Sequence, residues 1–227
     1  MSKLLSIALP ALAVFAAVAP ASADIVTTYT DSTNDLFDNG LGNLDIQSVS
    51  WTQVDTGGGW LLNLSITTRD WADWTKFMVF VNVPGSSGLS SNPWNRPVNL
   101  NGQVATHFWG AWVDSVADSQ YWSCSTSNGT WEQYGGVSQN IDVANKTLTL
   151  SLGWFPYGAA GFSFSFDVAT TGGGNDPGID HLSRSDLATS GWGSESVAGN
   201  FLQFTLVPAP GALALLGLAG LVSRRRR

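Results

Sequence analysis

Hydrophobic and polar side chains alternate through most of residues 24–206. The alternation is clearest at 162–168 and 60–67, where a period of two places successive side chains on opposite faces of a β-strand. Residues 76–83 are apolar at almost every position, which is typical of a strand covered on both faces. No stretch of ten residues shows the 3.6-residue period of an amphipathic α-helix, although 180–188 fits one helical turn.

Turn-forming residues divide this region into short strands. Asn128-Gly129 and Asn145 each lie between two strand-like runs, which is typical of a β-hairpin. The pattern predicts an all-β fold, a single antiparallel β-sandwich of about ten strands in one domain, residues 24–206. The expected strands are 24–30, 45–51, 60–67, 76–83, 106–114, 119–125, 130–134, 137–143, 146–154, 162–168 and 200–206.

The first 23 residues have the three parts of a secretory signal peptide. Lys3 is followed by an apolar run to Val18, and the small residues Ala21 and Ala23 form a cleavage site. We therefore expect an exported protein whose mature chain begins at Asp24.

The last segment, residues 207–227, combines a proline-containing hinge, a short apolar run and four terminal arginines. A run of twelve residues, 211–222, is short for a membrane-spanning helix, which needs about 20. We expect this run to form a short hydrophobic helix. It is either a weak C-terminal anchor or a sorting signal that is held in the membrane transiently. The arginines would keep this end at the cytoplasmic face.

The tail resembles a PEP-CTERM sorting signal, in the variant that begins Val-Pro-Ala-Pro-Gly-Ala. Ala209 stands where the plain motif has glutamate. The resemblance implies that an exosortase, a membrane-embedded cysteine transpeptidase of bacteria that make exopolysaccharide, processes the chain and that it reaches the cell surface or the extracellular matrix. The sorting residues it implies are Pro208, Ala209, Pro210, Arg224, Arg225, Arg226 and Arg227.

The acidic body of the chain excludes one class of partner. Residues 24–207 contain five basic and seventeen acidic residues, a formal charge of −12. A nucleic-acid surface needs clustered Lys and Arg, so we expect no nucleic-acid partner. Cys124 is the only cysteine, which rules out an intrachain disulfide, and we expect it to be buried.

Tryptophan is the most informative residue type. The chain has eleven, too many for one small core to enclose fully. Aromatic rings stack on the apolar faces of sugars while nearby polar groups bind the hydroxyls. The loop 92–97 offers Trp94 with Asn92, Asn95 and Arg96. Trp71, Trp74, Trp131, Trp154 and Trp192 also lie at strand ends or in loops, and any one of them could instead cap the sandwich.

The body resembles DOMON-like domains related to carbohydrate-binding modules of family 9. The resemblance rests on Phe-Met-Val-Phe-Val-Asn, Asn-Pro-Trp-x-Arg-Pro, His-Phe-Trp-Gly-Ala-Trp-Val-Asp and Phe-Asp-Val-x-Thr-x-Gly-Gly-Gly, in that order, within residues 45–206. It implies a β-sandwich that binds glycans through a cleft, with Trp94, Arg96, Trp109 and Trp112 as the first positions to test.

Evidence for catalysis or a resident cofactor is weak in the sequence. The chain lacks G-x-S-x-G and H-E-x-x-H motifs, and it has only two histidines, His107 and His181. Asp31, Asp35 and Asp38 share one loop, and Asp176 and Asp180 follow a triple glycine. Such loops suit Ca²⁺, but turns require the same residues, so we expect no cofactor and keep Ca²⁺ as an open alternative.

The sequence thus favours a non-catalytic, exported protein that binds extracellular polysaccharide. One alternative is a structural or adhesive matrix protein without a small-ligand site. A second is a glycan-active hydrolase, which would need two carboxylates about 5–10 Å apart in one cleft.

Overall fold

A five-stranded antiparallel sheet, sheet A, forms one layer of the molecule. Its strand order is β1-β2-β3-β10-β9. The computed structural model describes residues 24–207 except 56–59, 126 and 155–160. The signal peptide with Ala21 and Ala23, and the tail with Pro208, Ala209, Pro210 and Arg224–Arg227, lie outside the described residues. The strands of sheet A are β1 (Ile25–Thr30), β2 (Ile46–Asp55), β3 (Trp60–Thr68), β9 (Ser138–Asp142) and β10 (Thr147–Trp154).

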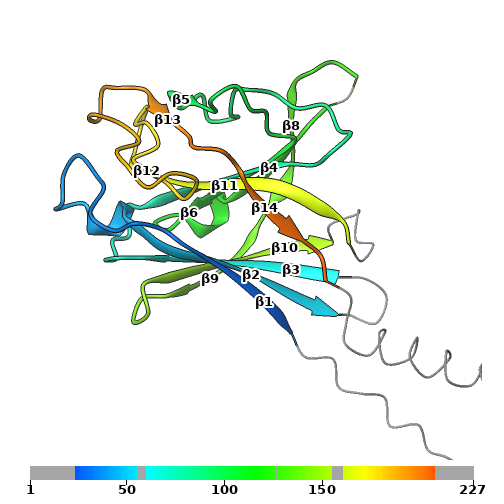
Figure 1. Cartoon of the computed structure of the whole chain (residues 1–227), viewed down its shortest axis with the longest axis horizontal. Helices are drawn as coiled ribbons and strands as arrows, with labels where there is room; N and C mark the ends of the chain where they lie inside the picture. The colour runs from blue at the N-terminus through cyan, green and yellow to red at the C-terminus, as the bar shows by residue number, and fades with distance from the viewer. Residues whose placement is uncertain (1–23, 56–59, 126, 155–160, 208–227) are drawn as a thin grey trace, which may run out of the picture.

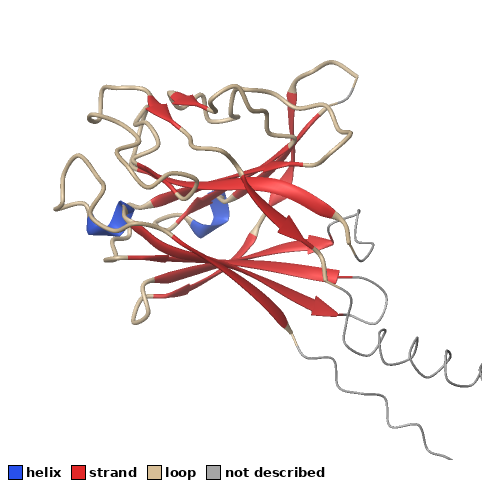
Figure 2. Cartoon of the chain, in the orientation of Figure 1, coloured by secondary structure: helices blue, strands red, loops and turns tan. Residues whose placement is uncertain are grey.

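A second antiparallel sheet, sheet B, lies across the first (Figures 1 and 2). Its order is β12-β11-β4-β6-β7-β8, and β14 pairs with the same edge of β11 as β12 does, farther along the strand. The strands are β4 (Lys76–Asn82), β6 (His107–Trp112), β7 (Gln120–Cys124), β8 (Trp131–Gly136), β11 (Ser163–Thr171), β12 (Asp180–His181) and β14 (Leu202–Thr205).

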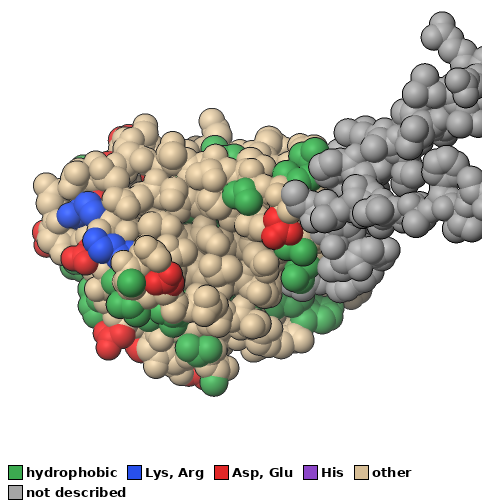
Figure 3. Space-filling view, turned by 90° about the horizontal axis from the view of Figure 1, so that it is seen from below, with side chains coloured by type: hydrophobic (Ala, Val, Ile, Leu, Met, Phe, Trp, Pro, Cys, Tyr) green, Lys and Arg blue, Asp and Glu red, His purple; other side chains and the backbone are tan. Residues whose placement is uncertain are grey.

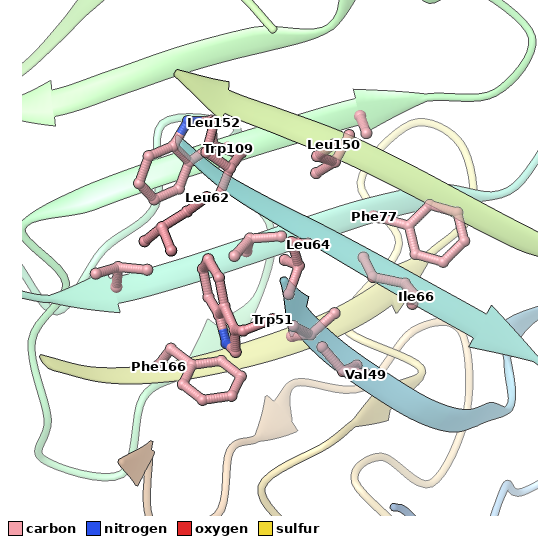
Figure 4. Packing of buried hydrophobic residues seen from close by; sticks show 14 of the residues in the cluster. Val49, Trp51, Leu62, Leu64, Ile66, Phe77, Trp109, Leu150, Leu152 and Phe166 are labelled. Atoms are coloured by element: carbon pink, nitrogen blue, oxygen red, sulfur yellow. The ribbon is translucent and has the colours of Figure 1, made fainter. Parts of the chain in front are cut away.

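The facing sides of the two sheets share one hydrophobic core. Trp51 on β2 is fully buried and lies edge-on to Phe164 and Phe166 of β11, with ring centroids 5.2 and 5.3 Å away. Leu62, Leu64 and other alternate residues of sheet A complete this layer (Figure 4). The period of two in the sequence therefore has its cause in this core, since every second residue of β3 enters it.

The opposite face of sheet B is covered by loops. Met78, Phe80 and Phe108 pack there against residues of the segments 84–106 and 172–201. Two short strands, β5 (Val98–Asn99) and β13 (Ser196–Val197), pair in parallel and join these segments above the sheet (Figure 1). This loop layer explains why β4 is apolar on both faces, and it contains most of the predicted binding residues.

The outer face of sheet A is polar and almost uncharged (Figure 3). Hydroxyl side chains form cross-strand hydrogen bonds there, between Thr28 and Ser50 at 2.8 Å and between Ser65 and Thr149 at 2.9 Å. These four residues lie in one register row across β1, β2, β3 and β10. The sheet therefore presents a row of uncharged hydrogen-bonding groups on this face.

The predicted fold class is confirmed at the level of an all-β chain with antiparallel sheets and a β-sandwich-like arrangement. Each of the eleven expected strands coincides with an observed one, and both predicted hairpins form, as β7–β8 and β9–β10. The helical turn expected at 180–188 is wrong, because Asp180 and His181 pair with β11 as β12. Helices in the described part of the chain are limited to the 3-10 turns η1 (Gly42–Leu44) and η2 (Val116–Asp118), and none of them could span a membrane.

Candidate functional site

Trp94 packs against sheet B instead of projecting into solvent. Its ring lies edge-on to Phe108 and Trp112, with centroids 5.3 and 5.4 Å away. The Trp94 Nε1 donates a hydrogen bond of 2.9 Å to Gln120 Oε1. The Trp94 ring can lie here because residue 110 is glycine, since a Cβ on residue 110 would overlap the ring. Trp94 is therefore half-buried and held on three sides.

Arg96 is buried beneath the glycine-rich loop 172–176. Its guanidinium donates to the carbonyl oxygens of Gly173 at 2.8 Å, Gly172 at 3.2 Å and Asp176 at 3.4 Å. Burial lowers the pKa of Arg96, and the carboxylate of Asp176 opposes that effect. The Asn92 side chain closes the turn below by bonding the backbone N and O of Arg96. Arg96 therefore joins two loops, and Asn92 closes the turn that carries Arg96.

The two tryptophans of β6 face opposite sides of the sheet, as their spacing predicts. Trp109 is only 3% exposed and stacks on Tyr121 within the main core, so its ring is not presented to solvent. Trp112 is half-buried, and the Nζ of Lys76 lies 4.7 Å from the centre of its ring. Interior packing therefore removes one of the two predicted rings from the surface.

A polar hollow does form around part of the predicted set. Asn92, Asn95 and Arg96 line it together with Glu195, and Trp94 is not among its lining residues. Asn95 is exposed and has a positive φ of 51°, which turns the chain at this point. The loop thus supplies hydrogen-bonding groups without the aromatic platform that we expected beside them.

An aromatic cluster with two exposed rings lies where the loop layer meets two other loops. It consists of Phe37, Trp74 and Trp192, which come from three separate loops. Trp74 is 38% exposed and Trp192 is 40% exposed, and their ring centroids are 6.4 Å apart with planes tilted by 56°. Phe37 lies edge-on to Trp192 at 5.7 Å. The sequence marks both tryptophans as loop residues, but nothing in it indicates that they meet.

Arg96 supports this cluster indirectly. The rings of Trp192 and the carboxylate of Asp176 both approach Gly172, where a side chain would collide with them. Arg96 holds the carbonyl of that same glycine from below. Similarly, Lys76 Nζ donates to the Trp74 carbonyl at 3.0 Å. Two buried cations therefore hold the backbone of Trp74 and the glycine-rich loop that Trp192 contacts.

A group of carboxylates converges between the loop after β1 and strand β12. Oxygen atoms of Asp35, Asp45 and Asp180 all lie within 4.8 Å of one another. Asp45 and Asp180 are 0% and 2% exposed. Burial raises the pKa of Asp31 to about 8, with the charges of Asp35 and Asp45 adding to the effect. Burial also raises the pKa values of Asp35 and Asp180.

The sequence predicts only part of this cluster. Asp31, Asp35 and Asp180 are candidates from the two aspartate-rich loops, whereas Asp38 and Asp176 lie outside the group. Asp45 follows η1 and was missed because it precedes an ordinary strand. The three clustered aspartates, Asp35, Asp45 and Asp180, share one feature. Each is next in sequence to a residue of a small apolar cluster, Leu36, Leu44 or Ile179.

A serine, a histidine and an aspartate are aligned beside the carboxylate group. His181 Nδ1 lies 2.7 Å from Asp167 Oδ2, and His181 Nε2 lies 3.2 Å from Ser196 Oγ. This order resembles a hydrolase triad. All three residues are 0% exposed, and Gly178 N also donates to Ser196 Oγ. The three residues thus form a buried hydrogen-bond network.

No protein-family model matches the chain, and no curated protein matches it in sequence. The fold therefore defines it only as an all-β protein of two facing antiparallel sheets, with its candidate sites in the loops between strands.

Proposed function

We propose that the protein is a non-catalytic, polysaccharide-binding β-sandwich of the cell surface or extracellular matrix. The observation that carries the proposal is the exposed pair Trp74 and Trp192, with Phe37 beside it. Large aromatic rings at the surface of a soluble domain are typical of recognition sites. The neighbouring Asp176 carboxylate and the polar hollow at Asn95 supply acceptors and donors for sugar hydroxyls.

The tilt between the rings narrows the class of polysaccharide. Two coplanar rings would match a flat, crystalline surface, whereas planes tilted by 56° suit a chain that bends or twists between successive sugars. The acidic body disfavours strongly anionic polymers by charge repulsion. We therefore propose a soluble, neutral or weakly charged glycan chain as the ligand.

The proposed location of the protein, at the cell surface or in the extracellular matrix, follows from its N-terminal and C-terminal segments. An N-terminal signal peptide would export the chain, and the PEP-CTERM-like tail would deliver it to an exosortase at the membrane. Both segments suit a protein that acts in an exopolysaccharide matrix, where weak binding by many copies is sufficient for retention.

Affinity electrophoresis through gels that contain a panel of soluble polysaccharides tests the proposal. Trp192→Ala and Trp74→Ala should each weaken retardation, because each removes a ring that can stack on sugar. Tyr134→Ala is the matched control, since Tyr134 is also exposed but lies on β8. Trp94→Ala distinguishes the predicted loop from the exposed cluster.

Two results would overturn this proposal. One is the absence of retardation by every polysaccharide in a broad panel. The other is equal retardation of wild type and the Trp74→Ala, Trp192→Ala double variant, each shown to be folded by its thermal transition.

A second candidate is a structural matrix protein that uses sheet A. The row of Thr28, Ser50, Ser65 and Thr149 offers an uncharged, hydrogen-bonding contact surface across four strands. For this function, Ser50→Lys with Ser65→Lys should abolish retention in a matrix, while the tryptophan variants should not change it. The two candidates thus predict opposite sets of sensitive residues.

A further inference from the structure

We propose that Asp35, Asp45 and Asp180, with Asp31 beside them, form a Ca²⁺ site that joins the loop after β1 to strand β12. The close set, Asp35, Asp45 and Asp180, places its oxygens within 4.8 Å of one another. Ca²⁺ binds oxygen ligands at 2.3–2.6 Å, so ligands on opposite sides of the ion are about 4.6–5.2 Å apart. The spacing therefore matches one ion surrounded by these carboxylates.

Unused oxygen atoms point to a cation. Asp45 is fully buried, and its Oδ1 has no hydrogen-bond partner among the described protein atoms, although its Oδ2 accepts from Asn34 N and Arg69 Nε. Both carboxylate oxygens of Asp35, and Oδ2 of Asp31, are likewise buried and without a partner there. A buried carboxylate oxygen with no donor is costly, and a metal ion between Asp35 and Asp45 would give their unpartnered oxygens a partner.

The charge around the site is poorly balanced by the protein. Among the described cations, Arg69 contacts Asp45 at 2.7 Å, while Arg184 is already paired with Asp186 at 2.8 Å. Four carboxylates thus share one direct cationic neighbour. The raised pKa values of Asp31, Asp35 and Asp180 express this mutual repulsion and burial. A divalent cation would offset most of this negative charge.

The ligand type favours Ca²⁺ over other common metals. The close set offers only oxygen atoms, which are the ligands of Ca²⁺ and Mg²⁺, whereas Zn²⁺ prefers nitrogen or sulfur. His181 is adjacent, but its two ring nitrogens are bonded to Asp167 and Ser196. Buried side chains from three segments suit the variable coordination of Ca²⁺ better than the strict, water-rich octahedron of Mg²⁺.

An access route and a role both follow from the position of the site. Asp31 lines a surface hollow with Thr30 and Ser183, which offers a path from solvent. Asp35 lies on the same loop as Phe37, which contacts the exposed Trp192. The ion would therefore order the loop that holds one edge of the aromatic cluster. This last step rests on the proposed polysaccharide function, whereas the ion site itself does not.

The decisive variant is Asp35→Asn. The oxygens of Asp35 accept no hydrogen bond from described protein atoms, so the change removes a ligand and a repulsive charge with little other loss. In EDTA, Asp35→Asn should raise the melting temperature above that of the wild type. In Ca²⁺, the order should reverse. Asp38→Asn is the matched control on the same loop, since Asp38 is exposed and bonds Gly40 N.

The measurement is isothermal titration of Ca²⁺ into the EDTA-treated, desalted full-length protein, with thermal unfolding in parallel. We expect one Ca²⁺ per chain, with a Kd between about 10⁻⁶ and 10⁻³ M, and a melting temperature that rises by roughly 5–10 °C at 100 times the Kd. Asp35→Asn should weaken Ca²⁺ binding at least about tenfold, while Asp38→Asn should not change it. An equal concentration of Mg²⁺ should give a smaller shift.

Absence of heat and of any melting shift up to about 10 mM Ca²⁺ would overturn the site, and would mean that the carboxylates share protons instead. Unchanged Ca²⁺ binding by Asp35→Asn would overturn the ligand assignment. Neither readout involves a polysaccharide, so the Ca²⁺ site and the proposed function can fail separately. If both hold, EDTA should weaken polysaccharide retardation of the wild type and leave that of Asp35→Asn unaffected.

Discussion

His181 and Asp167 form a fully buried hydrogen-bonded pair, with 2.7 Å between Nδ1 and Oδ2. The pair joins β12 to β11, and the other oxygen of Asp167 accepts from Val168 N and Ser183 N. Because the pair lies between the loop layer and sheet B, it fixes the segment from which Asp180 reaches the carboxylate group. The Ser196–His181–Asp167 arrangement, whose residue types resemble a catalytic triad, thus holds β12 and the following segment against β11.

Asp167→Ala should destabilise the protein by about 3–5 kcal/mol, because it leaves His181 and two backbone N–H groups buried without an acceptor. Asp167→Asn should cost less, about 1–2 kcal/mol, since its carbonyl oxygen can still accept from Val168 N and Ser183 N. Urea unfolding followed by tryptophan fluorescence measures both. Equal costs for the two variants would show that the hydrogen bonds of Oδ1 contribute little.

Two substitutions of Trp51 in the main core should lower the free energy of unfolding by different amounts. Its ring packs against Phe164, Phe166 and Phe204, yet its Nε1 has no hydrogen-bond partner among the described residues. Trp51→Ala should cost about 3–5 kcal/mol of unfolding free energy through the cavity it leaves. Trp51→Phe keeps an aromatic ring and removes a buried unpaired N–H, so it should cost less than about 2 kcal/mol.

Thermal and chemical denaturation of the two Trp51 variants provide the test. A matched comparison is Phe204→Ala, which opens the same region without involving a polar atom. If Trp51→Phe were as damaging as Trp51→Ala, the Nε1 would have a partner that stabilises the fold.

His107 should make the stability depend on pH. Burial lowers the pKa of His107 from 6.5 to about 4. The unfolded chain therefore binds the proton more tightly, so the stability that this group contributes is fully present above pH 6.5 and is lost as the pH falls towards 4. One pKa unit corresponds to 1.36 kcal/mol, which makes the loss about 3 kcal/mol.

His107→Asn removes this titration and can keep a hydrogen bond with Thr106, whose Oγ1 lies 2.8 Å from the histidine Nδ1. We expect the difference in unfolding free energy between pH 7 and pH 4 to shrink by about 3 kcal/mol in the variant. Urea titrations at both pH values, with wild type alongside, measure it. An unchanged difference would assign the acid sensitivity to other groups.

Arg96 should act as a loop clamp whose shape matters as much as its charge. Arg96→Lys keeps the positive charge but cannot reach the carbonyls of Gly172, Gly173 and Asp176 together. The expected cost is about 2–3 kcal/mol, as for lost hydrogen bonds to a charged group. Hydrogen exchange by mass spectrometry should show faster exchange at 172–176. Exchange that stays slow there would mean that the loop holds its shape without the clamp.

The alternation of side chains was enough to predict the longer strands, whereas the two-residue strands β5, β12 and β13 were not predicted. Residues 60–67 and 162–168 each show a period of two because one of their faces enters the shared core, and that requirement is local to each strand. Hairpin turns such as Asn128-Gly129 were predictable for the same reason, since a turn depends on the residues within it. The burial of Cys124 also follows from residue type and is confirmed.

The sites were much harder to predict, because they depend on which loops meet. Sequence placed Trp94 and Arg96 together, but the fold uses Gly110 to receive the indole and the carbonyls of loop 172–176 to bind the guanidinium. Trp74 and Trp192 are 118 positions apart in the chain, and Asp35 and Asp180 are 145 positions apart. Such residues become neighbours only through the order in which the strands pair, which brings their loops together. Local alternation determines which face of a strand is buried, but not which strand it pairs with.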